Sequence, residues 1–244
     1  MPYTSVNLSI LNVIIQYKEE SSLVHETKSI WIVGSSIMKQ AFTAARRSYD
    51  GANLGLKRHN YRVWWQGKGG MILEQLLPRI TFLLQIETAP DILVIHCGGN
   101  NIGKNKLHTL RRLIKKAMLI IHKMLPFTHI VWSQILPRSE WRYSRNCKAM
   151  NHAATRVNNF AASLCVQLGG SYLKYPEISW DTPEMFAVDG VHMSPMGNNI
   201  LLFHLQNILF SLTARNLIGS TGYGHGGMFV SLPLIGGGRR QIDP

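Results

Sequence analysis

The chain has 244 residues, of which 45% are hydrophobic and 16% are charged. This length and balance fit one packed domain with short extensions, and they argue against both a disordered chain and a second folded domain. The 26 Lys and Arg outnumber the 13 Asp and Glu, and the formal net charge of +13 favours contact with polyanions such as nucleic acid, anionic lipid or acidic proteins.

The N-terminal residues 1–28 carry no clear hydrophobic period, and we expect them to form a poorly structured leader. The predicted domain spans residues 29–214. Residues 215–244 are rich in glycine and predict a flexible tail.

The first predicted strand covers residues 30–33, whose apolar run Ile-Trp-Ile-Val is typical of a strand buried on both faces of a parallel sheet. Gly34 closes the run. Ser35 and Ser36 then provide an N-cap for a helix that we expect over residues 37–48.

The alternation of strand and helix continues along the chain. Further strands are expected over residues 61–65, 91–96, 128–135 and 171–174, and further helices over residues 71–86, 105–124, 147–168 and 195–213. Pro78 is expected to kink or restart the helix in which it lies. Strands that alternate with helices predict an α/β fold with a parallel sheet, right-handed crossovers and helices on both faces.

The three cysteines, Cys97, Cys147 and Cys165, show neither CxxC pairs nor metal-ligand spacing. We therefore expect a reducing, intracellular and cytoplasmic setting. The ten histidines form neither an HExxH motif nor a Cys/His cluster, so we expect no metal site, and we expect no other cofactor. Residues 5–16 lack the basic start and the cleavage site of a signal peptide. The longest apolar helix candidate, residues 200–212, is interrupted by His204, Gln206 and Asn207 and is too short to span a bilayer.

Three residues suited to chemistry each follow the end of a predicted strand: Ser36, Gly70 and Asn100. Ligands of open α/β sheets bind at the carboxyl ends of the strands, so we expect these turns to meet in one crevice. Ser36 is the candidate nucleophile, and its own N–H lies at a helix N-terminus. The Gly70 N–H and the Asn100 side-chain amide are further candidate donors to an oxyanion.

A candidate base pair follows later in the chain. His192 comes three residues after Asp189 in a predicted loop, where Asp189 would orient the imidazole and His192 would take the proton from Ser36. Taken singly, each of these residues has an ordinary role as a helix cap, a turn residue or a surface side chain. Their joint occurrence is what favours acyl transfer.

Four ordered sequence blocks resemble those of the SGNH (GDSL-like) hydrolases. They are Ile32-Val33-Gly34-Ser35-Ser36, Gln66-Gly67-Lys68-Gly69-Gly70, Gly98-Gly99-Asn100-Asn101 and Asp189-Gly190-Val191-His192. The resemblance implies a flavodoxin-like three-layer α/β/α sandwich with five parallel strands. It also implies catalysis by Ser36, Asp189 and His192, with an oxyanion hole formed by Ser36, Gly70 and Asn100. Family members cleave acyl esters, including those of lipids and acetylated sugars, and also thioesters, without a metal, so the resemblance implies a small-molecule or lipid ester as substrate.

Two positions depart from the family pattern, since Ser35 and Asn101 stand where the family has Asp. In the family these acids support the turns, so their replacement leaves the mechanism intact in principle but puts efficient catalysis in question. Residues 131–138, Val-Trp-Ser-Gln-Ile-Leu-Pro-Arg, also resemble esterase-like domains of vertebrate genomes, some of which lie within retroelement reading frames.

Two functions therefore stay open. The first is a serine esterase that acts through a covalent Ser36 intermediate, and the second is a catalytically idle SGNH fold that binds nucleic acid through its basic surface.

His96 is expected to be a packed histidine hydrogen-bonded to backbone. Most tryptophans are expected in the core, although some could line an acyl pocket: Trp64, Trp65, Trp132, Trp141 and Trp180. The acyl group, the alcohol and the oligomeric state are not indicated.

Overall fold

The computed structural model describes residues 27–219, so nearly all of the predicted leader and most of the predicted tail lie outside the described residues. Five parallel strands form one sheet in the order β2-β1-β3-β4-β5. They are β1 (Lys28–Gly34), β2 (Tyr61–Gly67), β3 (Ile92–His96), β4 (His129–Ser133) and β5 (Ser171–Leu173). The predicted α/β fold with a five-stranded parallel sheet is confirmed.

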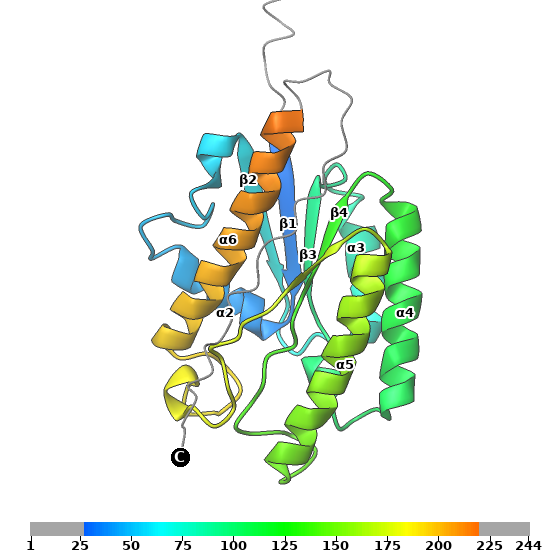
Figure 1. Cartoon of the computed structure of the whole chain (residues 1–244), viewed down its shortest axis with the longest axis vertical. Coiled ribbons are helices and arrows are strands. Elements are labelled where there is room, and N and C mark those ends of the chain that lie inside the picture. Colours follow the sequence, from blue (N-terminus) through cyan, green and yellow to red (C-terminus); the bar gives the residue numbers. More distant parts are fainter. Residues whose placement is uncertain (1–26, 220–244) are drawn as a thin grey trace, which may run out of the picture.

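Helices cover both faces of this sheet (Figure 1). One face carries α2 (Ser36–Ala45) and α6 (Pro195–Gly219), and the other carries α3 (Leu76–Leu83), α4 (Leu107–Met124) and α5 (Cys147–Gln167). Short 3₁₀ turns occur at η1 (Leu56–His59), η2 (Leu73–Gln75), η3 (Gly99–Asn101) and η4 (Pro183–Met185). Within residues 27–219, no helix is long and apolar enough to cross a membrane.

The strand side chains alternate between two hydrophobic cores. Ile30 and Ile32 of β1 pack with residues of α2 and α6, whereas Trp31 and Val33 pack with residues of α3, α4 and α5. All four are fully buried. Burial on both faces explains why the strand reads as a continuous apolar run.

Two helices differ most from their predicted bounds, and α2 ends three residues earlier than predicted, at Ala45. Instead of one helix over residues 71–86, the chain forms the η2 turn and then the shorter α3, in which Pro78 is the third residue. Proline is tolerated there because first-turn N–H groups have no partner within the helix. Helix α6 continues to Gly219, so residues 215–219 at the start of the predicted tail are helical.

The carboxyl ends of three strands are level with one another. Gly34 of β1 pairs with Gly67 of β2 on one side and with His96 of β3 on the other. A Cβ added to Gly34 would lie 2.7 Å from the His96 carbonyl oxygen and 2.6 Å from Met38 Cγ. Only glycine lets β1 end so close to β3, and the turns that follow the three strands are brought together.

His96 ends β3 inside the protein. Its Nδ1 lies 3.0 Å from the Ser133 hydroxyl, which lies 2.7 Å from the Tyr175 hydroxyl. The histidine is packed as expected, but its side-chain partner is a hydroxyl instead of a backbone group. Burial, and secondarily the charge of Arg138, lower the pKa of His96 to about 3, so the imidazole is neutral in the folded protein.

This buried imidazole predicts acid sensitivity. The ordinary histidine pKa is 6.5 and the folded pKa of His96 is about 3, so the unfolded chain binds the proton more readily. The contribution of His96 to the free energy of unfolding is fully present above about pH 6.5. It is lost as the pH falls toward 3, by up to about 1.4 kcal/mol per pH unit. Urea unfolding of the protein and of His96→Asn across this range measures it. Equal pH slopes for the two proteins would contradict the assignment.

Candidate active site

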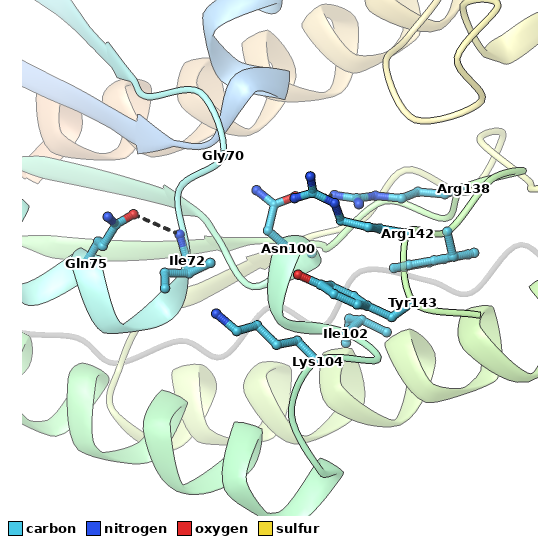
Figure 2. A pocket seen from close by; sticks show the side chains of 11 residues that line it. Gly70, Ile72, Gln75, Asn100, Ile102, Lys104, Arg138, Arg142 and Tyr143 are labelled. Carbon is cyan, nitrogen blue, oxygen red and sulfur yellow. Dashed lines mark hydrogen bonds between the residues drawn. The ribbon is translucent and has the colours of Figure 1, made fainter.

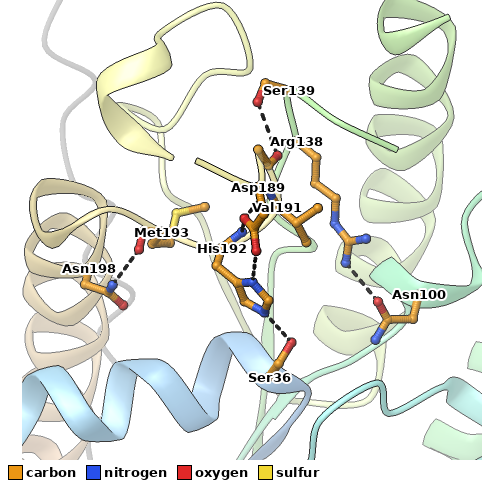
Figure 3. A network of polar contacts seen from close by, with 10 residues as sticks. Ser36, Asn100, Arg138, Ser139, Asp189, Val191, His192, Met193 and Asn198 are labelled. Carbon is orange, nitrogen blue, oxygen red and sulfur yellow. Dashed lines mark hydrogen bonds and ion pairs between the residues drawn. The ribbon is translucent and has the colours of Figure 1, made fainter. Parts of the chain in front are cut away.

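Ser36, His192 and Asp189 form one hydrogen-bonded line (Figure 3). Ser36 is the first residue of α2, and its Oγ lies 2.9 Å from His192 Nε2. On the other side of the ring, His192 Nδ1 lies 2.5 Å from Asp189 Oδ2. A carboxylate only accepts hydrogen bonds, so Nδ1 carries the proton and Nε2 is left as the acceptor for the serine hydroxyl.

The loop that carries Asp189 and His192 holds the carboxylate firmly. Asp189 Oδ1 accepts hydrogen bonds from the backbone N–H groups of His192 at 2.9 Å and Val191 at 3.0 Å. Desolvation works to raise the pKa of Asp189, but these hydrogen bonds and the imidazole outweigh it and lower the pKa to about 2. The Gly190 carbonyl accepts from the backbone of Ser139 and Glu140, which ties the loop to the segment after β4.

Gly70 lies in the turn after β2 with a φ of +67°, a left-handed conformation that glycine adopts without strain. Within residues 27–219, no group accepts a hydrogen bond from its N–H. The turn is linked to the one after β3, since Asn100 Nδ2 donates to the Met71 carbonyl at 3.0 Å. Gly70 and Asn100 line the same cavity.

Arg138, to which sequence reasoning assigned no role, orients the Asn100 amide. Its Nη2 donates to Asn100 Oδ1 at 3.1 Å, and its guanidinium lies over the ring of Trp141 at 5.0 Å from the centroid. A guanidinium only donates and the Met71 carbonyl only accepts, so these two neighbours fix which end of the amide carries nitrogen. The signal in the sequence was the position of Arg138 after β4, in a fourth turn at the same edge of the sheet.

The two departures from the family blocks lie beside this line of residues. Ser35 is the buried N-cap of α2, its side chain makes no capping hydrogen bond, and the hydroxyl that contacts His192 belongs to Ser36. Asn101 is fully buried. Its Oδ1 accepts from the Leu73 N–H at 2.9 Å, and its Nδ2 donates to Glu74 at 2.8 Å and to Asn105 at 3.2 Å.

The partners of Asn101 explain why an amide suits this position. An aspartate there would lose both donors and turn a carboxylate toward the carboxylate of Glu74. Asn101 therefore joins η3 to η2 with a matched set of hydrogen bonds, and none of the contacts among Ser36, His192 and Asp189 involves it.

Among the comparisons with known proteins, the one with solved structures identifies the fold. No protein-family model matches the sequence, and no curated protein matches it. A GDSL-like lipase from Bacteroides thetaiotaomicron superposes with a TM-score of 0.61 at 15% identity, over 81% of this chain and 97% of that one. A lipase/acylhydrolase from Enterococcus faecalis gives 0.59 at 17% identity, over 77% and 96%. An acetyl xylan esterase gives 0.55 at 16% identity, over 74% and 98%. The chain thus has the fold of GDSL-like lipases, acylhydrolases and esterases.

The contact between Asn101 and Glu74 predicts a coupled effect on stability. Asn101→Asp should lower the free energy of unfolding by about 1 to 3 kcal/mol, because it buries a charge beside a like charge and removes two donors. Adding Glu74→Gln should recover part of the loss, since the glutamine amide can donate to the new carboxylate. Urea unfolding of both single variants and the double variant measures the coupling. Strictly additive effects would show that the two side chains do not interact.

Proposed function

We propose that the chain is a serine esterase of the SGNH type that cleaves an acyl ester through a covalent Ser36 intermediate. The proposal is carried by the hydrogen-bonded line from Ser36 Oγ through His192 to Asp189, at a strand-to-helix junction. A nucleophile, a base and a group that orients the base are what acyl transfer by serine requires.

In the proposed acylation step, Ser36 Oγ attacks the acyl carbon and His192 Nε2 takes the hydroxyl proton. Asp189, ionised above about pH 2, stabilises the imidazolium that forms. The developing oxyanion accepts hydrogen bonds from the N–H groups of Ser36 and Gly70 and from the Asn100 amide. His192 then gives the proton to the departing alcohol. In the second step, His192 activates a water that releases the acyl group from Ser36.

Arg138 acts in this scheme as a positioning residue. Its hydrogen bond to Asn100 Oδ1 leaves one Nδ2 hydrogen for the Met71 carbonyl and the other for the oxyanion. A fixed donor of this kind costs no reorganisation when charge develops in the transition state.

The similar structures support hydrolysis of an acyl ester as the reaction, but they do not indicate which ester is the substrate. They include a lipase and an acetyl xylan esterase, whose names indicate different acyl groups and alcohols. On this fold the substrate is decided by loops around a common edge of the sheet. The resemblance of residues 131–138 to retroelement-associated esterase domains stays a prediction.

Labelling with a fluorophosphonate, which reacts with activated serines, tests the proposal directly. The unaltered protein and Ser35→Ala should both be labelled, while Ser36→Ala should not, because only the Ser36 hydroxyl contacts His192. Asp189→Asn should slow labelling by roughly a thousandfold or more, because the imidazole loses its preferred tautomer. Folding of each variant is checked by circular dichroism. Labelling that survives in Ser36→Ala, or no labelling of folded protein, would overturn the proposal.

A second candidate function, nucleic acid binding by the same fold, is favoured by the surface of α4. This helix contains no Asp or Glu. Its exposed cations are Arg111, Arg112, Lys115, Lys116 and Lys123. Within residues 27–219, none of them forms an ion pair with a carboxylate. A row of unpaired cations along one helix is the electrostatic pattern that phosphate backbones attract.

This candidate predicts a steep salt dependence. Binding to duplex DNA should weaken as salt rises, and changing Arg112, Lys116 and Lys123 to Gln should reduce the slope of log K against log salt by about 0.9 for each phosphate that the variant no longer neutralises. Fluorescence anisotropy at several salt concentrations measures the slope. The triple variant should keep its fluorophosphonate labelling, since α4 carries none of the proposed catalytic groups. Absent or salt-independent binding would remove this candidate.

A further inference from the structure

A cavity of about 290 Å³ opens beside two of the proposed oxyanion donors, Gly70 and Asn100. Three cationic side chains line it, Lys104, Arg138 and Arg142, and no carboxylate does. Figure 2 shows Arg138 and Arg142 reaching toward Asn100, with Lys104 below them. We call this cavity the cationic pocket.

The three cations reach the pocket from two separate segments. Lys104 follows η3, and both arginines lie in the segment between β4 and α5. Turns distant in sequence therefore deliver like charges to one cavity. Around a common cavity such charges repel one another, and the repulsion is relieved when an anion enters.

Arg138 is the deepest of these cations, with 8% of its surface exposed. Within residues 27–219, its guanidinium has no ion pair, and its side-chain hydrogen bond goes to the neutral amide of Asn100. Burial lowers the pKa of Arg138 to about 10 although Asp189 works in the opposite direction, so the group stays charged at neutral pH. A buried cation whose hydrogen-bond partner is neutral is stabilised further when a ligand brings a negative charge into contact with it.

The remaining walls of the pocket combine apolar and aromatic side chains with the polar side chain of Gln75. Ile72 and Ile102 line it, together with the rings of Trp141 and Tyr143. Of the tryptophans considered from the sequence, Trp141 lines this pocket, and it also packs in the hydrophobic core. Apolar walls with a few convergent polar groups are typical of sites that bind small organic molecules.

We infer that the cationic pocket binds a negatively charged group, a carboxylate or a phosphate, carried by the ester substrate. The inference rests on the proposed esterase function and names its substrate class: an anionic ester whose reacting carbonyl lies at Gly70 and Asn100 and whose charged group lies among Lys104, Arg138 and Arg142. The anion can sit on the acyl part or on the alcohol part of the ester.

Matched pairs of esters test the inference. Monophenyl adipate and phenyl hexanoate share a leaving group and differ by an anion on the acyl part, and 4-acetoxybenzoate and phenyl acetate differ by an anion on the alcohol part. We expect kcat/KM for the anionic member of one pair to exceed that of its neutral partner by about 10- to 100-fold, because charged hydrogen bonds would hold it. The favoured pair tells which part of the substrate carries the anion. Equal or lower values for both anionic esters would overturn the inference.

Substitutions in the pocket test whether the preference for an anionic ester arises there. The double variant Lys104→Gln with Arg142→Gln should lower the ratio of kcat/KM between the favoured anionic ester and its neutral partner by at least about tenfold. Arg156→Gln is the matched control, since Arg156 is an exposed residue of α5 outside the pocket. An equal fall of the ratio in Arg156→Gln would assign the preference to overall charge and overturn the inference.

A binding measurement separates this inference from the proposed function. Isothermal titration with adipate and with inorganic phosphate should show binding that weakens about tenfold or more in the double variant and persists in Arg156→Gln. Labelling of Ser36 without any preference for anionic esters would contradict the anion-binding inference and leave the proposed esterase function standing. Anion binding at the pocket without labelling of Ser36 would support anion binding by the pocket and contradict the proposed esterase function. Absence of anion binding in folded protein, with no preference in turnover, overturns the inference.

Discussion

The end of β1 is held between β2 and β3 by a contact that admits only glycine. Gly34 pairs with Gly67 and with His96, and a Cβ in its place would meet the His96 carbonyl at 2.7 Å. Because the three strands end level, Ser36, Gly70 and Asn100 come together although they are far apart in sequence. A wider separation of these strands would leave each turn intact and still disperse the site.

Hydrogen bonds between turns, more than hydrophobic packing, set the orientation of the polar groups at this edge. Asn100 is held by Met71 and Arg138, Asn101 by Leu73 and Glu74, and His192 by Asp189. Each polar side chain is positioned by a partner from another segment or from its own loop. Groups fixed in this way before substrate arrives are what electrostatic stabilisation of a transition state demands.

The sequence predicted the central strands β1, β3 and β4 well because they are largely buried and contain apolar runs, as residues 30–33 do. The edge strands β2 and β5 are only partly buried. It predicted helices less well where local signals compete, as around Pro78, where a 3₁₀ turn and a short helix replace one long helix. Ser36, Gly70 and Asn100 were visible because each follows a strand, whereas Asp189 and His192 were singled out by their spacing in a loop. The role of Arg138 was not visible, because it depends on contacts with Asn100 and Trp141, and no local pattern encodes contacts between distant loops.

The cations behind the net charge of +13 lie in different environments. The α4 cations are exposed to water, where salt screens them and each contributes little except to a polyanion that spans several. Arg138 is buried and bonded to a neutral amide, so its field is weakly screened and acts on the cavity beside it. One count of Lys and Arg thus contains cations spread along an exposed helix and cations that converge on one cavity, and the proposed anion site depends on the convergence.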